Sequence, residues 1–351
     1  MATALLTRPS VDEEFAAIVD ELTRRGLIAG GLGGAALLGL GACTDERSSA
    51  APSSSEPTTR TIDTAYGPVQ APANPKRIVC VDTYTVSALL DVGVTPVGVG
   101  DGGADLMLAA YEPTYASIPK VASADDEISL EKIAALTPDL ILGVDYPYIA
   151  KARTKLAAIA PTAIFTWDSS GDWAAMVRSA ATAVGRAGQE GSLEAGYRAR
   201  AAEIKSTYAD VLAATTVELV TAGGGQAYVW LRGSGVAAVL TDAGVRLGSA
   251  SQGPGVKATS DDQASGFKAL SYEQLDVLSD ATEIITLATP DGAIDPDSKA
   301  MTERPVFTRL PAAKAGHVDA LVNFFPFSYG QAKAALDELA GVLERLRTSA
   351  S

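Results

Sequence analysis

Histidine and cysteine are nearly missing from this chain of 351 residues, which has one histidine and two cysteines. The cysteines, Cys43 and Cys80, form no Cys-x-x-Cys pair, so the composition gives no support to a zinc site. A Ser–His–Asp triad would need His317, and no nucleophile-elbow motif accompanies it. We interpret His317 as a surface turn residue, and we expect neither a protein metal site nor catalysis.

Basic residues are also scarce, because 28 Lys and Arg against 42 Asp and Glu give a formal net charge of −14. This balance weighs against nucleic-acid binding, which needs clustered positive charge. Hydrophobic residues make up 47% of the chain and charged residues 20%, proportions that are typical of a globular protein. The length is sufficient for two domains.

A membrane-spanning run is lacking, since a spanning helix needs about 20 consecutive apolar residues. The charge-free stretch at residues 26–42 is shorter and rich in glycine, and it directly follows Arg24 and Arg25. A basic pair, an apolar stretch and small residues before Cys43 predict an export signal. A buried core helix is the alternative for this segment.

The residues Leu40, Gly41, Ala42 and Cys43 resemble the bacterial lipobox. The resemblance implies cleavage before Cys43 and a lipid on its thiol, and hence an extracytoplasmic, membrane-anchored protein. The arginine pair resembles a twin-arginine signal only in part, so the Sec and twin-arginine export routes both stay open. The tract that follows is rich in Ser, Pro and Thr, and it predicts a flexible tether.

Apolar runs alternate with helical patterns after the tether, which indicates parallel βαβ units. Cys80 lies in such a run and is interpreted as a core residue, with a disulfide to Cys43 as the alternative. The expected strands of this first lobe are 78–81, 97–100, 140–144 and 163–166, and its expected helices are 85–91 and 130–136.

Residues 172–213 read almost wholly as helix, with a break expected at 185–188. The part from 189 to 212 is long enough to cross between two lobes. A second α/β pattern follows, with expected strands 217–221, 227–231 and 283–287 and helices 235–242 and 331–346. The predicted fold is therefore α/β, with two lobes of mostly parallel sheets joined by one long helix. The predicted parts are an export signal (1–42), a tether (43–60), an N-terminal lobe (61–171), a helical connector (172–213) and a C-terminal lobe (214–351).

Two segments of the chain match each other, one in each predicted lobe. Ser129 precedes a helix with Glu131 in its first turn, and Ser271 with Glu273 repeats this arrangement. Helix capping explains each glutamate alone, because Ser is a good N-cap and an acidic residue suits the positive helix end. Capping does not explain why both lobes present a glutamate at the same place.

The runs 74–79, 89–99 and 130–141 carry a resemblance to a known family. The motif Leu-Glu-x-Ile followed by Leu-x-Pro-Asp-Leu-Ile resembles the iron-siderophore and vitamin B12 class of substrate-binding proteins, the extracytoplasmic receptors of importing ABC transporters. The resemblance covers residues 60–346 and implies two α/β lobes bridged by one long helix. It also implies that Glu131 and Glu273 dock onto arginines of the membrane permease.

Ligands of α/β lobes bind beyond the carboxyl ends of the strands. Arg232 is the leading candidate for a charge partner of an anionic chelate, with Arg246 and Arg304 behind it, and core packing is the alternative for each aromatic residue. The candidate ligand-binding residues are Tyr84, Asp101, Tyr146, Tyr148, Trp167, Trp230, Arg232, Phe325 and Tyr329.

The function expected from these features is that of a monomeric, lipid-anchored receptor for a ferric siderophore, working with permease subunits. It needs no cofactor, because the siderophore already fills the coordination shell of iron. A receptor for haem or cobalamin is the first alternative, and iron or haem bound through tyrosines is a weaker one. An enzyme would need paired carboxylates such as Asp101 and Asp145 in the cleft. A purely structural surface protein is the last alternative.

Overall fold

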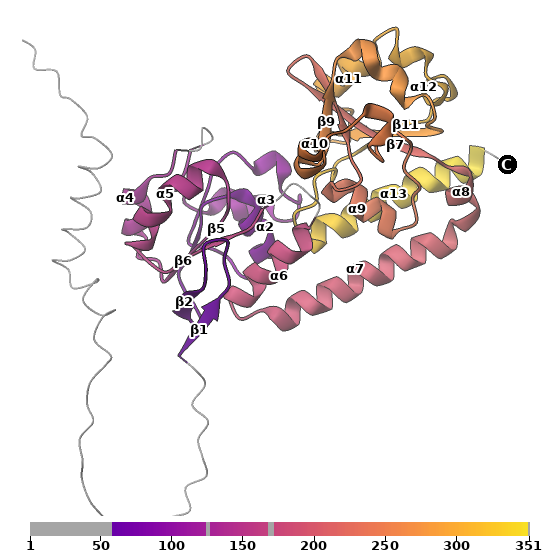
Figure 1. Ribbon diagram of the computed structural model, residues 1–351. Coiled ribbons are helices and arrows are strands. Elements are labelled where there is room, and N and C mark those ends of the chain that lie inside the picture. The colour runs from indigo at the N-terminus through magenta and orange to yellow at the C-terminus, as the bar shows by residue number, and fades with distance from the viewer. Residues whose placement is uncertain (1–57, 124–126, 168–171, 350–351) are drawn as a thin grey trace, which may run out of the picture.

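The computed structural model describes residues 58–123, 127–167 and 172–349. They form two α/β lobes joined by the long helix α7 (Ala187–Thr207), as Figure 1 shows, so the predicted fold class is confirmed. The predicted export signal, with Cys43, and most of the predicted tether lie outside the described residues. No helix within the described part is long and apolar enough to cross a membrane.

The N-terminal lobe is built on a four-stranded sheet with the order β4-β3-β5-β6. All its pairings are parallel, and every strand residue is buried, as expected of a sheet covered on both faces. A separate hairpin of β1 and β2 begins at Thr59, so the first described strand starts inside the stretch predicted as tether. The strands are β1 (Thr59–Ile62), β2 (Val69–Pro72), β3 (Ile78–Cys80), β4 (Gly98–Val99), β5 (Leu140–Val144) and β6 (Thr162–Phe165).

The carboxyl ends of β3 and β5 are tied together by Asp82. Its carboxylate accepts hydrogen bonds from the Thr85 amide at 2.8 Å, which caps helix α2, and from the Val144 amide at 2.9 Å. This side chain therefore fixes where α2 leaves the sheet. The helical segments of the lobe are α2 (Thr83–Asp91), η1 (Ala104–Leu106), α3 (Glu112–Ser117), α4 (Leu130–Ala135) and α5 (Pro147–Ala157).

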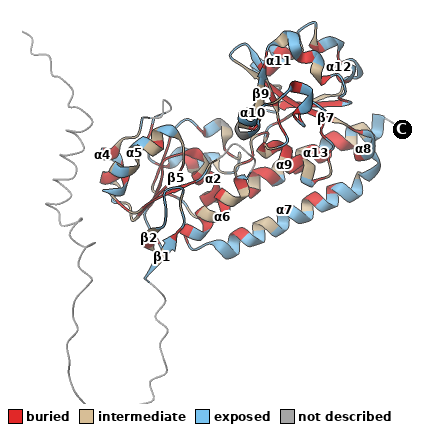
Figure 2. Ribbon diagram, in the orientation of Figure 1, coloured by how far each residue is buried: buried red, intermediate tan, exposed pale blue. Residues whose placement is uncertain are grey.

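The helical connector contains the predicted break. Helix α6 (Trp173–Ala183) ends before Gly185, whose φ of 71° is the left-handed conformation that ends helices, and α7 begins at Ala187. Helix α7 has 21 residues and stops at Thr207, where a second break precedes α8 (Ala209–Ala214). It lies alongside the C-terminal helix α13 (Tyr329–Ser349), and Figure 2 shows that much of its surface is exposed.

The C-terminal lobe has a five-stranded sheet with the order β11-β10-β7-β8-β9. This sheet is mixed, because β8 pairs antiparallel with both β7 and β9, whereas β10 pairs parallel with β7 and β11. The two-residue turn of Gly224 and Gly225 explains the β7–β8 hairpin, since both residues have positive φ, as a tight hairpin turn requires. The strands are β7 (Val217–Gly223), β8 (Gln226–Trp230), β9 (Phe267–Leu270), β10 (Glu283–Leu287) and β11 (Val318–Leu321).

Helix α13 starts at the N-terminal lobe and runs back along the C-terminal one. The Gly330 amide donates to the Asp91 carboxylate at 2.8 Å, and the Gln331 side-chain amide donates to the Leu106 carbonyl at 2.5 Å. The lobes are therefore joined by α7 and again by the start of α13. The remaining helical segments are α9 (Gly235–Asp242), η2 (Pro254–Val256), α10 (Ser260–Ser265), η3 (Tyr272–Leu278), α11 (Pro296–Thr302), η4 (Phe307–Arg309) and α12 (Pro311–Ala315).

Cys80 and His317 take the structural roles expected of them. Cys80 is a free thiol in β3 with no exposed surface, and burial raises its pKa. His317 is half-buried in the turn before β11, and its Nδ1 lies 3.0 Å from the Thr282 carbonyl oxygen.

Candidate functional site

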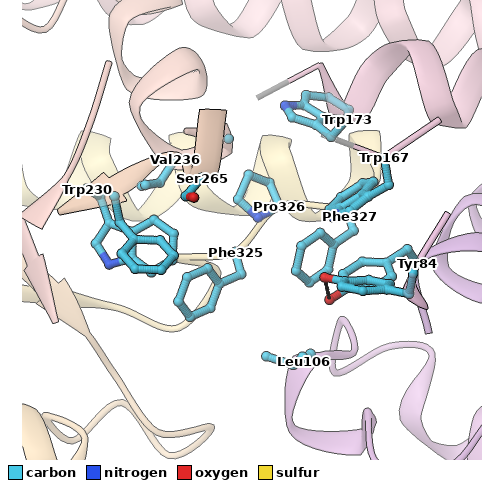
Figure 3. A pocket seen from close by; sticks show the side chains of 13 residues that line it. Tyr84, Leu106, Trp167, Trp173, Trp230, Val236, Ser265, Phe325, Pro326 and Phe327 are labelled. Carbon is cyan, nitrogen blue, oxygen red and sulfur yellow. Dashed lines mark hydrogen bonds between the residues drawn. The ribbon is translucent and has the colours of Figure 1, made fainter. Parts of the chain in front are cut away.

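A cavity of about 290 Å³ lies between the two lobes, and Figure 3 shows the side chains around it. Its volume is just below the usual range for small-molecule sites, about 300–1,000 Å³. The residues that line it are Tyr84, Leu106, Tyr146, Trp167, Trp173, Trp230, Gly235, Val236, Ser265, Phe267, Phe325, Pro326 and Phe327.

The wall from the N-terminal lobe is a cluster of aromatic rings at the carboxyl ends of β3, β5 and β6. Tyr84 lies in the first turn of α2, Tyr146 precedes α5, and Trp167 follows β6. The ring centroid of Tyr84 lies 5.7 Å from that of Tyr146 and 4.5 Å from that of Trp167. The hydroxyls of Tyr84 and Tyr146 are hydrogen-bonded at 3.0 Å, which holds the two rings as one surface.

The wall from the C-terminal lobe is centred on Trp230, the last residue of β8. Its ring contacts Phe267 at 5.4 Å and Phe325 at 5.0 Å between centroids. Its indole N–H donates to the Thr221 hydroxyl at 2.9 Å, so the ring is fixed by the neighbouring strand β7. The site is thus preformed on this side by hydrogen bonding as well as packing.

The segment 322–328, between β11 and α13, connects the two walls. Along it, Phe324, Pro326 and Ser328 are buried, whereas Phe325 and Phe327 are half-buried and line the cavity. Phe325 packs on the C-terminal wall, and Phe327 reaches the N-terminal wall, where its centroid lies 4.5 Å from that of Tyr84. Phe325 and Phe327 are two positions apart, which is the period of an extended chain, so both rings face the cavity.

Trp173, the first residue of α6, closes the back of the cavity. It is 4% exposed, and its ring packs edge-on against Tyr329 at 5.0 Å and Tyr197 at 5.8 Å. Behind it, the Tyr329 hydroxyl donates to the buried Glu190 carboxylate at 3.0 Å. Tyr329 therefore supports the cavity from behind and does not line it, contrary to its place among the predicted ligand contacts.

The described residues that line the cavity include no charged side chain. Burial raises the pKa of Tyr84, and the hydrogen bond with Tyr146 and the charge of Asp82 raise it further, so the phenol stays neutral. The buried Asp82 carboxyl has a pKa raised to about 6 by desolvation, against which its hydrogen bonds act. A phenolate ligand for iron is disfavoured at Tyr84, and a neutral, aromatic surface is what the site presents.

The structure brings five of the predicted ligand-binding residues to the cavity. They are Tyr84, Tyr146, Trp167, Trp230 and Phe325.

The other predicted polar and aromatic candidates lie elsewhere. Tyr148 stacks on the outer side of the cluster, 6.1 Å from the Tyr146 ring, and is not a lining residue. Asp101 is exposed and binds the Gly102 amide, and Asp145 accepts from the Tyr66 hydroxyl. Since neither carboxylate lines the cavity, the paired acids that an enzyme would need there are not formed by these residues.

The three predicted charge partners are also outside the lining. Arg232 is exposed, because its chain turns away after β8, where its amide binds the Ser251 carbonyl. Arg246 donates to the Thr216 hydroxyl at the amino end of β7, the sheet edge opposite to the carboxyl ends. Arg304 lies over the Tyr272 ring, 4.9 Å from its centroid, beside Glu273. Within the described residues, no group of three or more His, Cys, Asp or Glu could hold a metal ion.

Glu131 and Glu273 occupy equivalent places in the two lobes. Glu131 is exposed in the first turn of α4, which leads into β5, and Glu273 is exposed at the start of η3, which leads into β10. Strand β5 lies between β3 and β6, and β10 lies likewise between β7 and β11, with parallel pairing throughout. The pKa of Glu273 is lowered, chiefly by its own backbone N–H and then by the Ser271 hydroxyl.

Several lining residues were not among the sequence candidates, chiefly Trp173, Phe267 and Phe327. Phe327 belongs to an aromatic run whose extended alternation with Phe325 is the signal that could have identified it. Trp173 begins a helix, and Phe267 begins a strand that was not predicted, so neither carries a local sign of facing a cavity. The other additional lining residues are Leu106, Gly235, Val236, Ser265 and Pro326.

Comparison with known proteins gives matches over most of the chain. The profile of a family described as periplasmic binding protein matches residues 78–322. A Bacillus subtilis protein with the provisional name of ABC transporter substrate-binding lipoprotein YhfQ is 28% identical over 284 residues, 78% of this chain and 85% of that one.

The names of two further similar proteins refer to siderophores. A Bacillus subtilis protein named as a probable siderophore-binding lipoprotein, YfiY, is 33% identical over 181 residues, which is 50% of this chain and 54% of that one. The solved structure of the siderophore periplasmic binding protein from the fuscachelin gene cluster of Thermobifida fusca is 31% identical. It matches with a TM-score of 0.68 and covers 78% of this chain and 98% of that one.

Proposed function

Since the chain belongs to the periplasmic binding protein family, we propose that it binds a ferric siderophore in the cavity between its lobes and delivers it to the permease of an importing ABC transporter. The observation that carries the proposal is the aromatic cavity built by both lobes. Its walls supply large, rigid apolar faces, which suit an organic chelate.

The donor set of the cavity supports a metal that arrives already coordinated. Among the residues that the structure describes, the lining offers neutral hydroxyls and ring faces and no carboxylate, imidazole or thiolate. Naked iron would need such ligands or several ionised tyrosines. A siderophore supplies all the metal ligands itself, so the protein has only to recognise the outer surface of the chelate. The names of YfiY and of the Thermobifida fusca protein agree with this ligand class.

Delivery to a permease is supported by Glu131 and Glu273. Both carboxylates are exposed at equivalent places in the lobes, and neither forms an ion pair within the described residues. Arginine binds carboxylates through two parallel hydrogen bonds, which gives the contact direction as well as strength. One such contact on each lobe would orient the cavity toward the transporter.

Retention at the cell surface is the proposed role of Cys43. A lipid on its thiol, followed by the Ser-, Pro- and Thr-rich tract, would hold a monomeric receptor outside the cytoplasm and near its permease. The name of YhfQ as a lipoprotein agrees with this arrangement.

Tryptophan fluorescence tests the binding proposal directly, because all three tryptophans of the chain line the cavity. Titration of the purified full chain with ferric siderophores should give saturable quenching at sub-micromolar concentration. Haemin and cobalamin are the comparison ligands. Saturation by either of them, with no response to any ferric siderophore, would refute the proposal.

A pair of variants in one segment separates the cavity from its surroundings. Phe325→Ala removes a lining ring and should weaken binding by about 5–100-fold, the usual effect of truncating an aromatic anchor. Val322→Ala is the matched control, because Val322 is 36% exposed and lies outside the lining. Equal affinities of the two variants would show that the chelate binds elsewhere.

A further inference from the structure

The chelate class can be narrowed from the charges around the cavity, an inference that rests on the proposed function. Among the thirteen described residues that line the cavity none is charged, and three of their polar groups already have hydrogen-bond partners. The hydroxyls of Tyr84 and Tyr146 bind each other, and the Trp230 indole N–H binds Thr221. Ser265, at the end of α10, adds a small neutral group on the C-terminal side (Figure 3).

The cations closest along the chain to the lining do not compensate for this lack. Lys268 follows Phe267, but its ammonium group is bound to the Asp262 carboxylate at 2.8 Å. Arg232 is exposed and outside the lining. The structure does not describe the internal segments 124–126 and 168–171, and neither segment contains a lysine or an arginine.

The remaining electrostatics of the site disfavour an anion. The faces of aromatic rings carry negative charge density, which attracts cations and repels anions. Asp82 lies behind the N-terminal wall, and its negative charge contributes to the raised pKa of the Tyr84 phenol. Moving a net anion from water into this cavity would therefore bring desolvation without a compensating partner.

Ferric siderophores differ in net charge according to their chelating groups. Three hydroxamates carry one negative charge each and neutralise the ferric ion. Three catecholates carry two each and leave the chelate strongly anionic. We propose that the cavity is selective for uncharged or cationic ferric chelates of the tris-hydroxamate type and discriminates against tris-catecholate chelates.

The test is a fluorescence titration of the native full chain with two ferric chelates, ferrioxamine B as the tris-hydroxamate and ferric enterobactin as the tris-catecholate. The hydroxamate chelate should bind at least about 100-fold more tightly, as expected when an unpaired charge would be desolvated. Equal or tighter binding of the catecholate chelate would overturn the charge selectivity and leave the siderophore function standing. Binding of neither chelate, with haemin or cobalamin bound instead, would overturn the proposed function as well.

A charge-introducing variant checks the physical cause. Ser265→Lys places an ammonium group in the cavity, where it should attract the anionic catecholate chelate at low dielectric. The ratio of the affinity for ferrioxamine B to the affinity for ferric enterobactin should therefore fall at least about tenfold. Ser265→Gln adds a similar length without charge and should leave the ratio near its native value. Thermal unfolding curves establish that both variants are folded. An unchanged ratio in a folded lysine variant would show that charge does not set the selectivity.

Discussion

Replacing Glu283 with glutamine should stabilise the protein at neutral pH. Glu283 begins β10, an interior strand of the C-terminal sheet, has no exposed surface, and accepts no hydrogen bond at either carboxylate oxygen. Burial, together with the negative charge of Asp319, raises its pKa from an ordinary 4.5 to about 9, against the opposing charge of Arg345. The ion pair of Arg345 with Asp319 leaves Glu283 as the neutral member of the group.

The sign of the effect follows from proton linkage. Between pH 4.5 and about pH 9, the folded protein keeps a proton on Glu283 that the unfolded chain has released. The contribution of this group to stability is therefore fully present below pH 4.5 and is lost as the pH rises through about 9. Each pH unit in this window lowers the free energy of unfolding by about 1.4 kcal/mol. The stability lost through Glu283 by about pH 7.5 is therefore at most about 4 kcal/mol.

Glutamine resembles the protonated glutamate in shape and cannot ionise. We expect Glu283→Gln to raise the free energy of unfolding by about 1–3 kcal/mol at about pH 7.5, and to give no gain at about pH 4.5. Urea unfolding of the native chain and the variant across this range measures the difference. Glu218 and Asp82, whose pKa values are raised to about 7 and about 6, contribute equally to both curves.

The control is Glu303→Gln, which changes an exposed glutamate. It should shift the unfolding free energy by less than about 0.5 kcal/mol, as surface substitutions usually do. Parallel stability curves for the native chain and Glu283→Gln would refute the reasoning, because they would mean that Glu283 is ionised in the folded state at neutral pH.

Three further predictions concern transport, the junction between the lobes and anchoring. Glu131→Ala combined with Glu273→Ala should abolish siderophore uptake by cells while ligand affinity is retained, and a large loss of affinity would place these residues at the ligand. Gly330→Ala should lower the free energy of unfolding by about 1–3 kcal/mol, because a Cβ there would lie 2.6 Å from an N-lobe carboxylate oxygen. Gly341→Ala, in the same helix with nothing within 4 Å of a Cβ, should be neutral or stabilising by up to about 1 kcal/mol, and urea unfolding measures both variants. Cys43→Ser should release the protein from membranes, and persistent lipid labelling of that variant would contradict the lipobox interpretation.

The N-terminal wall of the cavity was predictable from local sequence. Strands followed by helices imply a parallel sheet, and the carboxyl ends of such strands meet at one edge. Tyr84, Tyr146 and Trp167 each lie within four residues of the carboxyl end of a buried strand, so their convergence depended only on the order of elements. The C-terminal sheet was less predictable, because the antiparallel β8 changes which ends of the strands meet.

The charge of the site could not be predicted from residue types. Arg232 follows Trp230 by two positions, yet Trp230 lines the cavity and Arg232 is exposed. Tyr329 and Phe327 are also two positions apart, but α13 begins between them and turns Tyr329 toward Glu190. A side chain's direction at the end of an element depends on how the backbone turns there, which distant contacts decide.

The sequence by itself determined the two-lobe α/β fold, the long connecting helix and the pair of equivalent glutamates. These features follow from hydrophobic periodicity and capping, which are interactions between near neighbours along the chain. Only the tertiary structure decided that the cavity is aromatic and uncharged. That property depends on residues from both lobes and from the segment 322–328 meeting in space, with Arg232 outside the lining and Lys268 paired with Asp262.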